Sequence, residues 1–280
     1  MTVSGKARVA GVMAWPVAHS LSPRLHGHWI ARYGLDAAYV PMAVPPEKLE
    51  AAVRALPALG FAGANVTVPH KEAAFAAMDS LSDEARAIGA VNTIIVRKDG
   101  SLFGDTTDGR GFLANIRDAH PGWSARGKAV AIVGAGGAAK AIAWALHADG
   151  ADEVRIINRT PARAVALAQA LGGRAKAVAW EHSAAALEDV ALVANATTLG
   201  MKGQPMLEVD LGPLPQNAIV TDIVYTPLET DLLRRARQRG NPAVDGLGML
   251  LHQAKPGFAA WFGKEPEVDA KLHDFVRKGP

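Results

Sequence analysis

The chain has 280 residues, 49% of them hydrophobic and 20% charged, which is the composition of a folded protein with room for two domains of ordinary size. A net charge of +3 gives no reason to expect nucleic-acid binding, although a pI near 9.2 suits an anionic small substrate. The absence of cysteine excludes disulfides, thiolate catalysis and cysteine-ligated zinc.

Strand-like and helix-like patterns alternate in the N-terminal part of the chain. Strands are predicted over residues 9–13, 38–44 and 64–68, and helices over residues 23–33, 47–59 and from residue 69 onward. Ser22 is predicted to cap the first helix, which Pro23 opens and Gly34 ends. The turn signal at residues 98–100 predicts a hairpin between strands at 93–97 and 102–103, and a helix over 109–118 follows.

A second strand–helix series starts after the break at residues 120–122. It opens with an apolar strand over 129–133, then a glycine-rich turn and an alanine-rich helix that ends near residue 148. Further strands are expected over 153–157, 175–178, 192–194 and 219–222, and further helices over 162–171, 230–239, 249–261 and 268–277. Repeated alternation of this kind favours an α/β fold with a mostly parallel sheet.

No apolar stretch is long enough to span a membrane. Residues 9–18 weakly resemble a signal peptide, but Pro16 interrupts the apolar run and no clear cleavage site follows. We therefore expect a cytoplasmic protein with no membrane partner.

The glycine-rich turn, residues 134–139, reads Gly-Ala-Gly-Gly-Ala-Ala and fits the pattern G-x-G-x-x-A between a strand and a helix. In that context, backbone N–H groups and the helix dipole cradle a pyrophosphate. A tight turn without a ligand is the alternative, but the strand–turn–helix context favours a dinucleotide site.

The end of the next strand distinguishes NAD from NADP. An NAD site usually carries an acid there, which accepts a hydrogen bond from the ribose 2′-hydroxyl. Here Asn158, Arg159 and Thr160 follow the strand, Arg163 stands one helical turn later, and the nearest acids precede the strand. Because arginine pairs with phosphate in a bidentate manner, these residues favour NADP. The alternative is that the two arginines merely solvate a helix face.

A nicotinamide enzyme that oxidises an alcohol needs a proton acceptor beside the reacting carbon. No Tyr-x-x-x-Lys pair and no H-E-x-x-H motif occurs, and no metal site is predicted. Lys71 is the best candidate, because it stands on the first turn of a helix directly after a strand whose Asn65 and Thr67 share one face. A solvated surface lysine is the alternative interpretation, and Asp108, near the start of the next helix, is equally explained as an N-cap.

Several ordered segments resemble those of one known family. They are His19-Ser20-Leu21-Ser22-Pro23 and residues 65–72, 89–93, 104–109, 134–139, 158–160, 195–197 and 245–250 with Gln253. Through these segments, nearly the whole chain resembles the shikimate dehydrogenase family. The resemblance implies an NADP-dependent enzyme that interconverts 3-dehydroshikimate and shikimate, in the route to chorismate and the aromatic amino acids.

The resemblance also implies a domain plan. An α/β substrate-binding domain would span residues 1–108 and be completed by the C-terminal helices of residues 246–280. A Rossmann-like NADP-binding domain would span residues 109–245. The protein would be a monomer or a homodimer.

The family's functional residues map onto matching positions of this chain. Lys71 and Asp108 would form the catalytic pair that moves the proton at the reacting oxygen. The implied substrate contacts are Ser20, Ser22 and Tyr225 toward the carboxylate, and Thr67, Asn92 and Gln253 toward the ring hydroxyls. The implied cofactor contacts are Gly134, Gly136, Gly137 and Ala138 at the pyrophosphate, Asn158, Arg159, Thr160 and Arg163 at the adenosine phosphate, and Thr197, Gly246 and Met249 near the nicotinamide.

Two departures from the family pattern bear on substrate preference. Thr106 stands where the family commonly has Asn, and Trp15 stands where a small or polar residue is usual. A quinate/shikimate or aminoshikimate dehydrogenase is therefore the alternative enzyme. A non-catalytic ligand sensor is the alternative from another class, although such a protein is expected to have lost Lys71 or Asp108.

Overall fold

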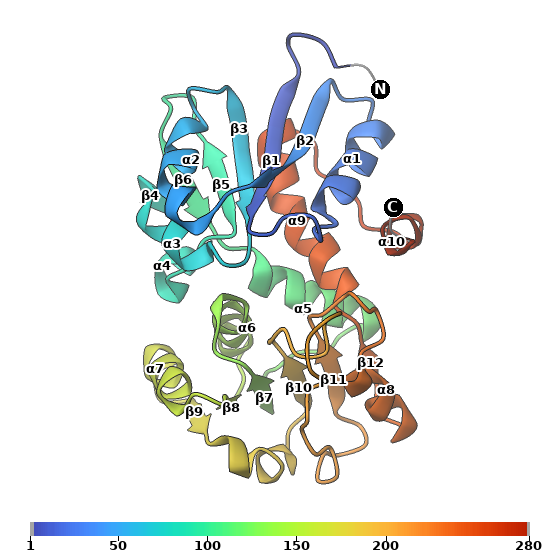
Figure 1. The fold of residues 1–280 in the computed structure, drawn as a ribbon. Coiled ribbons are helices and arrows are strands. Elements are labelled where there is room, and N and C mark those ends of the chain that lie inside the picture. Colours follow the sequence, from blue (N-terminus) through green and yellow to red (C-terminus); the bar gives the residue numbers. More distant parts are fainter. Residues whose placement is uncertain (1–2, 279–280) are drawn as a thin grey trace. The chain divides into compact units, whose positions relative to one another are not determined.

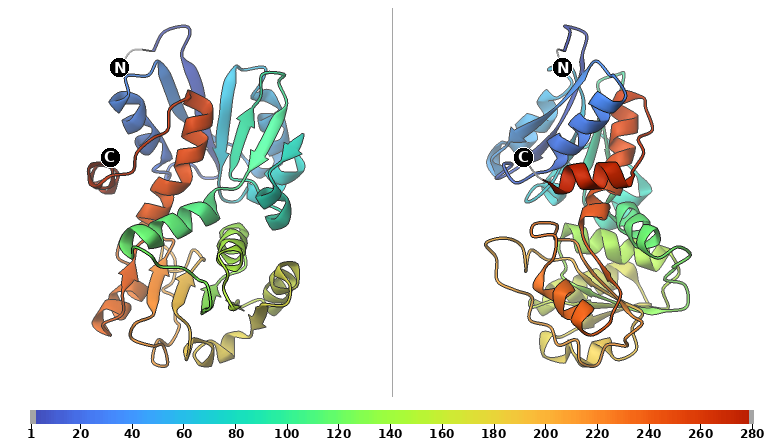
Figure 2. Two further views of the ribbon diagram at one scale, coloured as in Figure 1. Left: turned by 180° about the vertical axis from the view of Figure 1, so that it is seen from behind. Right: turned by 90° about the vertical axis from the view of Figure 1, so that its right-hand side faces the viewer.

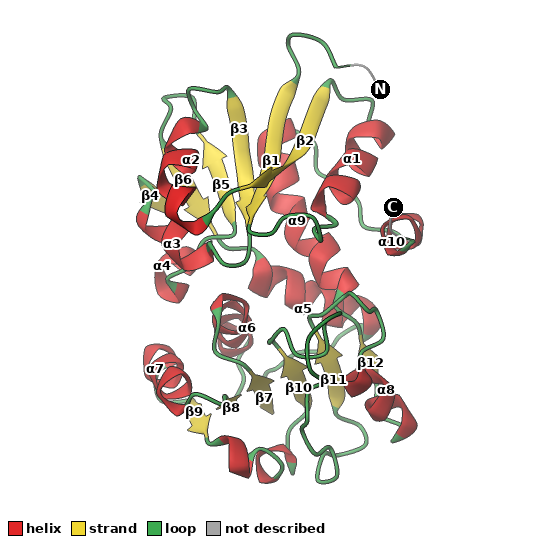
Figure 3. Ribbon diagram, viewed as in Figure 1, coloured by secondary structure: helices red, strands yellow, loops and turns green. Residues whose placement is uncertain are grey.

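The computed structural model describes residues 3–278, which form two compact units. One unit comprises the described parts of residues 1–107 and 250–280, and the other comprises residues 108–249. Each contains a six-stranded sheet flanked by helices (Figures 1 and 3). The predicted fold class, a two-domain α/β protein, is confirmed. Among residues 3–278, no helix combines the length and the apolar character needed to cross a bilayer.

The sheet of the first unit is mixed. Its strand order is β2-β1-β3-β5-β6-β4, with β1 parallel to β2 and β3, and β5 antiparallel to β3 and β6. The strands are β1 (Arg8–Ala14), β2 (Ala37–Ala43), β3 (Phe61–Val66), β4 (Ser80–Leu81), β5 (Thr93–Val96) and β6 (Leu102–Asp105). The predicted hairpin of residues 93–103 is therefore present as β5 and β6.

Helices cover both faces of this sheet (Figure 2). On one face, Val53 and Ala74 pack in the same apolar core as the strand residues Met13 and Val66. On the other face, α1 and α9 meet through aromatic rings, with Trp29 and Phe258 5.1 Å apart between centroids. The helical elements of this unit are α1 (Ser22–Arg32), the 3₁₀ turn Pro46–Lys48, α2 (Leu49–Ala55), α3 (Lys71–Ala76), α4 (Asp83–Ile88), most of α9 (Leu247–Phe262) and α10 (Ala270–Arg277).

Gly63 lets α9 lie directly on the sheet. The indole N–H of Trp261 donates to the carbonyl oxygen of Ile94 at 2.9 Å. A Cβ at Gly63 would overlap both of these groups, and the φ of +154° disfavours any other residue there. This close approach fixes the helix that carries Gln253.

The sheet of the second unit is entirely parallel, with the order β12-β11-β10-β7-β8-β9. Its strands are β7 (Ala129–Val133), β8 (Glu153–Ile157), β9 (Ala175–Val178), β10 (Leu192–Asn195), β11 (Ile219–Asp222) and β12 (Ala243–Val244). Strand order reverses between β7 and β10, and in doubly wound sheets ligands bind beyond the carboxyl ends of the strands at such a point.

Alternate residues of these buried strands serve two cores. Ile132 packs toward Phe112 of α5 and Ile142 of α6, whereas Val133 packs toward the core that contains Leu233 of α8. The helical elements are α5 (Asp108–Ala119), α6 (Gly137–Ala148), α7 (Pro161–Leu171), the 3₁₀ turns Trp180–His182 and Ala185–Leu187, and α8 (Asp231–Gln238).

One predicted helix is shorter than expected. The helix predicted over residues 47–59 is a 3₁₀ turn followed by α2, which ends at Ala55. Pro57 explains this end, because its ring clashes with the carbonyl of the residue four positions earlier in a continuing helix.

Candidate functional site

The segment that carries Ser20 and Ser22 connects β1 to the start of α1 (Figure 1). Ser20 is half-buried, and its Oγ accepts a hydrogen bond from the backbone N–H of Ser22 at 3.3 Å. Ser22 is buried and is the first residue of α1, whereas Leu21 occupies the cap position and no side chain caps the helix. The prediction that Ser22 is the N-cap is therefore wrong. Pro23 already lacks one of the N–H groups that a cap would satisfy.

Lys71 begins α3, directly after β3 and a short turn. The backbone N–H of Val91 donates to the carbonyl oxygen of Lys71 at 2.9 Å. The backbone N–H of His70 donates to the carbonyl oxygen of Thr67, also at 2.9 Å. The buried His70 is in turn held by Val44, whose carbonyl oxygen lies 2.8 Å from its Nε2. These contacts hold the start of α3 beside the segment that carries Asn92.

Asn92 is the centre of a buried polar network. Its Oδ1 accepts from the backbone N–H of Thr107 at 3.0 Å and from Thr93 Oγ1 at 2.9 Å. Its Nδ2 donates to Thr107 Oγ1 at 3.0 Å and to Gln253 Oε1 at 3.3 Å. The structure thus brings together two predicted substrate residues, Asn92 and Gln253, which are 161 positions apart in the chain.

A second pair, Tyr39 and Asn65, extends this network. The hydroxyl of Tyr39 donates to Asn65 Oδ1 at 2.6 Å, and Asn65 Nδ2 donates to the carbonyl oxygen of Asn92 at 3.2 Å. The Tyr39 ring stacks on His26 at 3.9 Å between centroids. Burial raises the pKa of Tyr39 and lowers the pKa of His26 to about 3, so both rings are uncharged at neutral pH. The sequence carried no signal for Tyr39, because β2 and β3 come close only by flanking β1 in the sheet.

Asp108 is the first residue of α5, and only 5% of its surface is exposed. It begins the second unit, whereas Lys71 belongs to the first. The pairing of these two side chains therefore stays a prediction. Thr106, one of the two departures, is buried, and its backbone N–H donates to Asp105 Oδ1 at 2.8 Å. Trp15, the other, is 48% exposed.

The glycine-rich turn connects β7 to α6, as predicted. Gly134 has a φ of +121°, and a Cβ there would lie 2.9 Å from the carbonyl oxygen of Ala196. A Cβ at Gly136, the N-cap of α6, would meet nothing within 4 Å. Gly137 and Ala138 follow as the first residues of the helix, neither fully buried. The open space before a helix N-terminus fits a pyrophosphate.

The carboxyl end of β8 carries cations and no acid. Arg159 and Arg163 are exposed, and within residues 3–278 neither forms an ion pair. Asn158 Nδ2 donates to the carbonyl oxygen of Thr160 at 2.9 Å, which shapes the turn before α7. Glu153, the acid on this strand, lies at its amino end and pairs with Arg155 at 2.6 Å.

The remaining predicted cofactor and substrate residues of this unit follow β10, β11 and β12. Thr197 donates from its N–H and its Oγ1 to Asn195 Oδ1, at 3.1 and 2.7 Å. Tyr225 is half-buried, and burial raises the pKa of its phenol. Gly246 packs against the backbone of β11, and Met249 is buried in the core beneath α5 and α6.

Comparison with known proteins agrees with this geometry. Residues 12–94 match the model of the shikimate dehydrogenase substrate binding domain, and residues 118–222 match that of shikimate / quinate 5-dehydrogenase. A curated relative from Paramagnetospirillum magneticum, named shikimate dehydrogenase (NADP(+)), is 57% identical over 98% of this chain and 99% of its own.

Solved structures agree over the full length. A shikimate 5-dehydrogenase from Thermus thermophilus, in complex with NADP(H) and shikimate, is 36% identical with a TM-score of 0.86, covering 97% of this chain and 99% of its own. A quinate dehydrogenase from Corynebacterium glutamicum, in complex with NAD, is 29% identical with a TM-score of 0.89, covering 97% of this chain and 99% of its own. The chain therefore belongs to the shikimate dehydrogenase family.

Proposed function

We propose that the protein is an NADP-dependent shikimate dehydrogenase, which reversibly reduces 3-dehydroshikimate to shikimate in the synthesis of chorismate and the aromatic amino acids. The observation that carries this proposal is the full-length match at 57% identity to a relative with that printed name. The polar network around Asn92 in one unit and the glycine-rich turn in the other support it.

The unit of residues 108–249 is assigned to NADP. Gly134, Gly136, Gly137 and Ala138 hold the pyrophosphate, because the turn is open in front of α6. The exposed Arg159 and Arg163, with Asn158 and Thr160, hold the adenosine phosphate. Thr197, Gly246 and Met249 are assigned to the neighbourhood of the nicotinamide half.

The unit of residues 1–107 and 250–280 is assigned to the substrate. The hydroxyls of Ser20 and Ser22 are assigned to its carboxylate, and so is that of Tyr225. Thr67, Asn92 and Gln253 bind the ring hydroxyls. The amide of Asn92 is already held by Thr107, Thr93 and Gln253, so little side-chain entropy is lost when substrate binds.

Reduction adds a hydride to the ketone carbon and a proton to its oxygen, and NADPH, when bound, supplies the hydride. Lys71 donates the proton to that oxygen in reduction and accepts it in oxidation. Asp108 is assigned as the second member of the catalytic pair for this proton transfer.

The alternative is a quinate/shikimate or aminoshikimate dehydrogenase, since a quinate dehydrogenase shares this fold. That solved relative carries NAD, whereas the arginines at the end of β8 favour NADP here. A cytoplasmic location and a monomeric or homodimeric state stay predictions.

The direct test is to incubate purified protein with shikimate and NADP and to follow NADPH formation, with product identification by mass spectrometry. We expect NADPH and 3-dehydroshikimate in equal amounts. Shikimate binding by calorimetry without any turnover would overturn the proposal and favour a ligand sensor.

A further inference from the structure

Asp222, the last residue of β11, is a buried carboxylate to which the proposed reaction gives no role. Only 1% of its surface is exposed. Its Oδ1 accepts from Asn195 Nδ2 and from the backbone N–H of Val224, both at 3.0 Å. Its Oδ2 accepts from Thr230 Oγ1 at 2.7 Å. One side chain thus connects the carboxyl ends of two strands with the start of a helix.

The first connection controls the loop after β10. Asn195 Nδ2 also donates to the carbonyl oxygen of Leu199 at 3.0 Å, while its Oδ1 accepts both donors of Thr197. The Thr197 hydroxyl in turn accepts from the Leu199 N–H at 3.0 Å. The amide of Asn195 therefore shapes residues 197–199, and Asp222 fixes which way that amide is turned.

The second connection controls the segment after β11. The bond from Val224 sets the backbone direction immediately before Tyr225. Lys202 N–H donates to the carbonyl oxygen of Thr226 at 2.9 Å, so the two loops also meet through their backbones. Gly246 closes the group, because a Cβ there would lie 2.8 Å from the carbonyl oxygen of Asp222.

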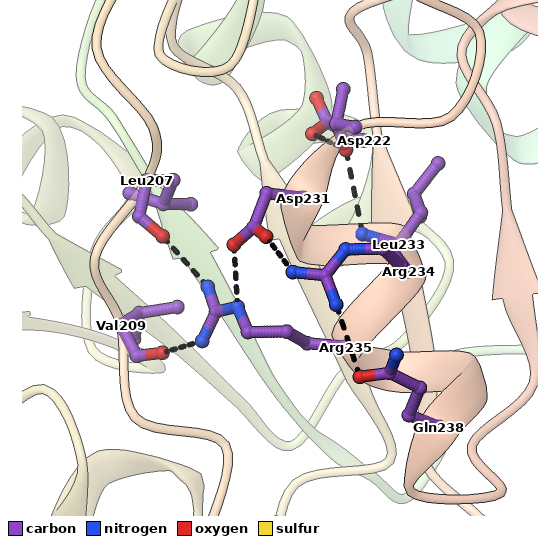
Figure 4. A network of polar contacts seen from close by, with 9 residues as sticks. Leu207, Val209, Asp222, Asp231, Leu233, Arg234, Arg235 and Gln238 are labelled. Carbon is purple, nitrogen blue, oxygen red and sulfur yellow. Dashed lines mark hydrogen bonds and ion pairs between the residues drawn. The ribbon is translucent and has the colours of Figure 1, made fainter.

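The third connection anchors the carboxylate to α8. Thr230 caps this helix by accepting from the N–H of Leu233 at 3.4 Å. One turn further, Arg235 donates to the carbonyl oxygens of Leu207 and Val209, both at 2.7 Å, and pairs with Asp231 (Figure 4). These contacts hold α8 in place, and through Thr230 they also hold the Asp222 carboxylate.

No positively charged group of residues 3–278 compensates the charge of the Asp222 carboxylate. All three donors are neutral, and within residues 3–278 no cation pairs with this carboxylate. Burial accordingly raises its pKa. Burying a carboxylate without a cation costs folding free energy, so stability alone does not explain an acid at this position.

We propose that Asp222 is a positioning residue for the nicotinamide end of the cofactor and for Tyr225. It holds the Thr197–Leu199 loop and the Val224–Tyr225 segment in one fixed arrangement, through Asn195 and through the backbone. The inference rests on the proposed function, which assigns Thr197, Gly246 and Tyr225 to the site. When a group that orients a reactant is displaced by about 1 Å, the rate falls by up to roughly 10²-fold.

The test compares Asp222→Ala with Asp222→Asn. The alanine variant is expected to lose roughly 10- to 100-fold in kcat and to bind NADP several-fold more weakly in calorimetry. The asparagine variant keeps an acceptor for Asn195 and Val224, so it is expected to recover most of both. Thr230→Val removes the contact to Oδ2 and also the cap on the Leu233 N–H. It is expected to shift kcat and NADP affinity in the same direction by less, and it serves if the alanine variant does not fold.

Asn241→Ala is the matched control. Asn241 is also a buried polar side chain of this unit, and its Nδ2 donates to the carbonyl oxygens of Pro215, Gln216 and Ala218. These groups precede β11 and β12, at the amino ends of the strands. We expect this variant to lower the melting temperature and to leave kcat and NADP affinity unchanged.

A double-mutant cycle with Thr197→Ala separates positioning from general destabilisation. If Asp222 acts through the loop, Thr197→Ala is expected to cost less in the Asp222→Ala background than in the wild type. Strictly additive effects, or an Asp222→Ala variant that behaves like Asn241→Ala, would overturn the inference. Wild-type turnover of shikimate tests the proposed function separately, and NADP affinity reports on the loop even if that turnover is absent.

Discussion

The predicted substrate side chains differ in how firmly the protein itself holds them. Asn92 is fixed on both its oxygen and its nitrogen, whereas Ser20 accepts one backbone hydrogen bond and is half-buried. Since a pre-positioned group costs less entropy on binding, Asn92 is expected to supply orientation and the serines to supply attraction for the carboxylate.

Replacement of Lys71 tests its proposed role in proton transfer. Lys71→Ala is expected to lower kcat by roughly 10²- to 10⁴-fold, the usual contribution of a positioned proton donor. Initial rates and a circular dichroism spectrum measure activity and folding in parallel. Lys48→Ala, at an exposed position of the same unit, is the control and is expected to behave like the wild type. A folded Lys71→Ala enzyme with near-normal kcat would remove the residue from the mechanism.

The two arginines after β8 test cofactor choice. Arg159→Ala combined with Arg163→Ala is expected to raise KM for NADP by about 10- to 100-fold, since hydrogen bonds to charged groups contribute about 1.5–3 kcal/mol. KM for NAD, which lacks the phosphate, is the internal control and is expected to change little. An equal loss with both cofactors would assign the arginines a structural role instead.

Local residue patterns indicated many of the candidate site residues, but not the contacts that hold them. Lys71, Asn92 and the glycine-rich turn stand in short motifs that can be read along the chain. Tyr39 and Asp222 were not predicted, because their partners lie 26 and 27 positions away and come close only when each sheet forms.

Among the elements, strands of four or more residues were predictable and two-residue strands were not. The strands at 129–133, 153–157, 175–178 and 219–222 have the predicted bounds. Those at 129–133 and 219–222 are mostly buried, as is typical of a parallel sheet. The two-residue strands β4 and β12 and the short helix α4 were not predicted. Two residues are too few to show a hydrophobic period, so only their neighbours define them.

The docking of α10 on α1 makes stability depend on pH. Asp269 caps α10 by accepting from the Leu272 N–H at 2.8 Å and pairs with Arg32 at 2.8 Å. The hydrogen bond from the Leu272 N–H lowers the pKa of Asp269 most, and the hydrogen bond from Arg32 lowers it further. Because the folded state favours the ionised form, this stabilisation is complete above the unfolded pKa, near 3.8, and is lost as the pH falls through the lower folded value.

Asp269→Ala is therefore expected to lower the free energy of unfolding by about 1 kcal/mol at pH 7, the usual value of an N-cap, and by less near pH 3. Thermal unfolding at both pH values measures the difference. Asp274→Asn, on the exposed side of the same helix, is the control. A loss that is the same at both pH values would contradict this account.

On the scale of the whole molecule, the chain passes from one compact unit to the other and back again. The change from one compact unit to the other falls at the first residue of α5 and within the first turn of α9. Each crossing lies next to predicted site residues, Asp108 in one case and Met249 in the other. The proposed division of labour, substrate in one unit and NADP in the other, follows from which side chains each unit carries.

The most direct test of the central claim is a comparison of kcat/KM for shikimate and quinate, each with NADP and with NAD, using one preparation of the wild-type protein. We expect kcat/KM to be highest for shikimate with NADP. Replacing either the substrate or the cofactor is expected to lower kcat/KM by at least tenfold, which corresponds to about 1.4 kcal/mol in transition-state stabilisation. A kcat/KM for quinate with NAD that equals or exceeds the value for shikimate with NADP would contradict the proposed function.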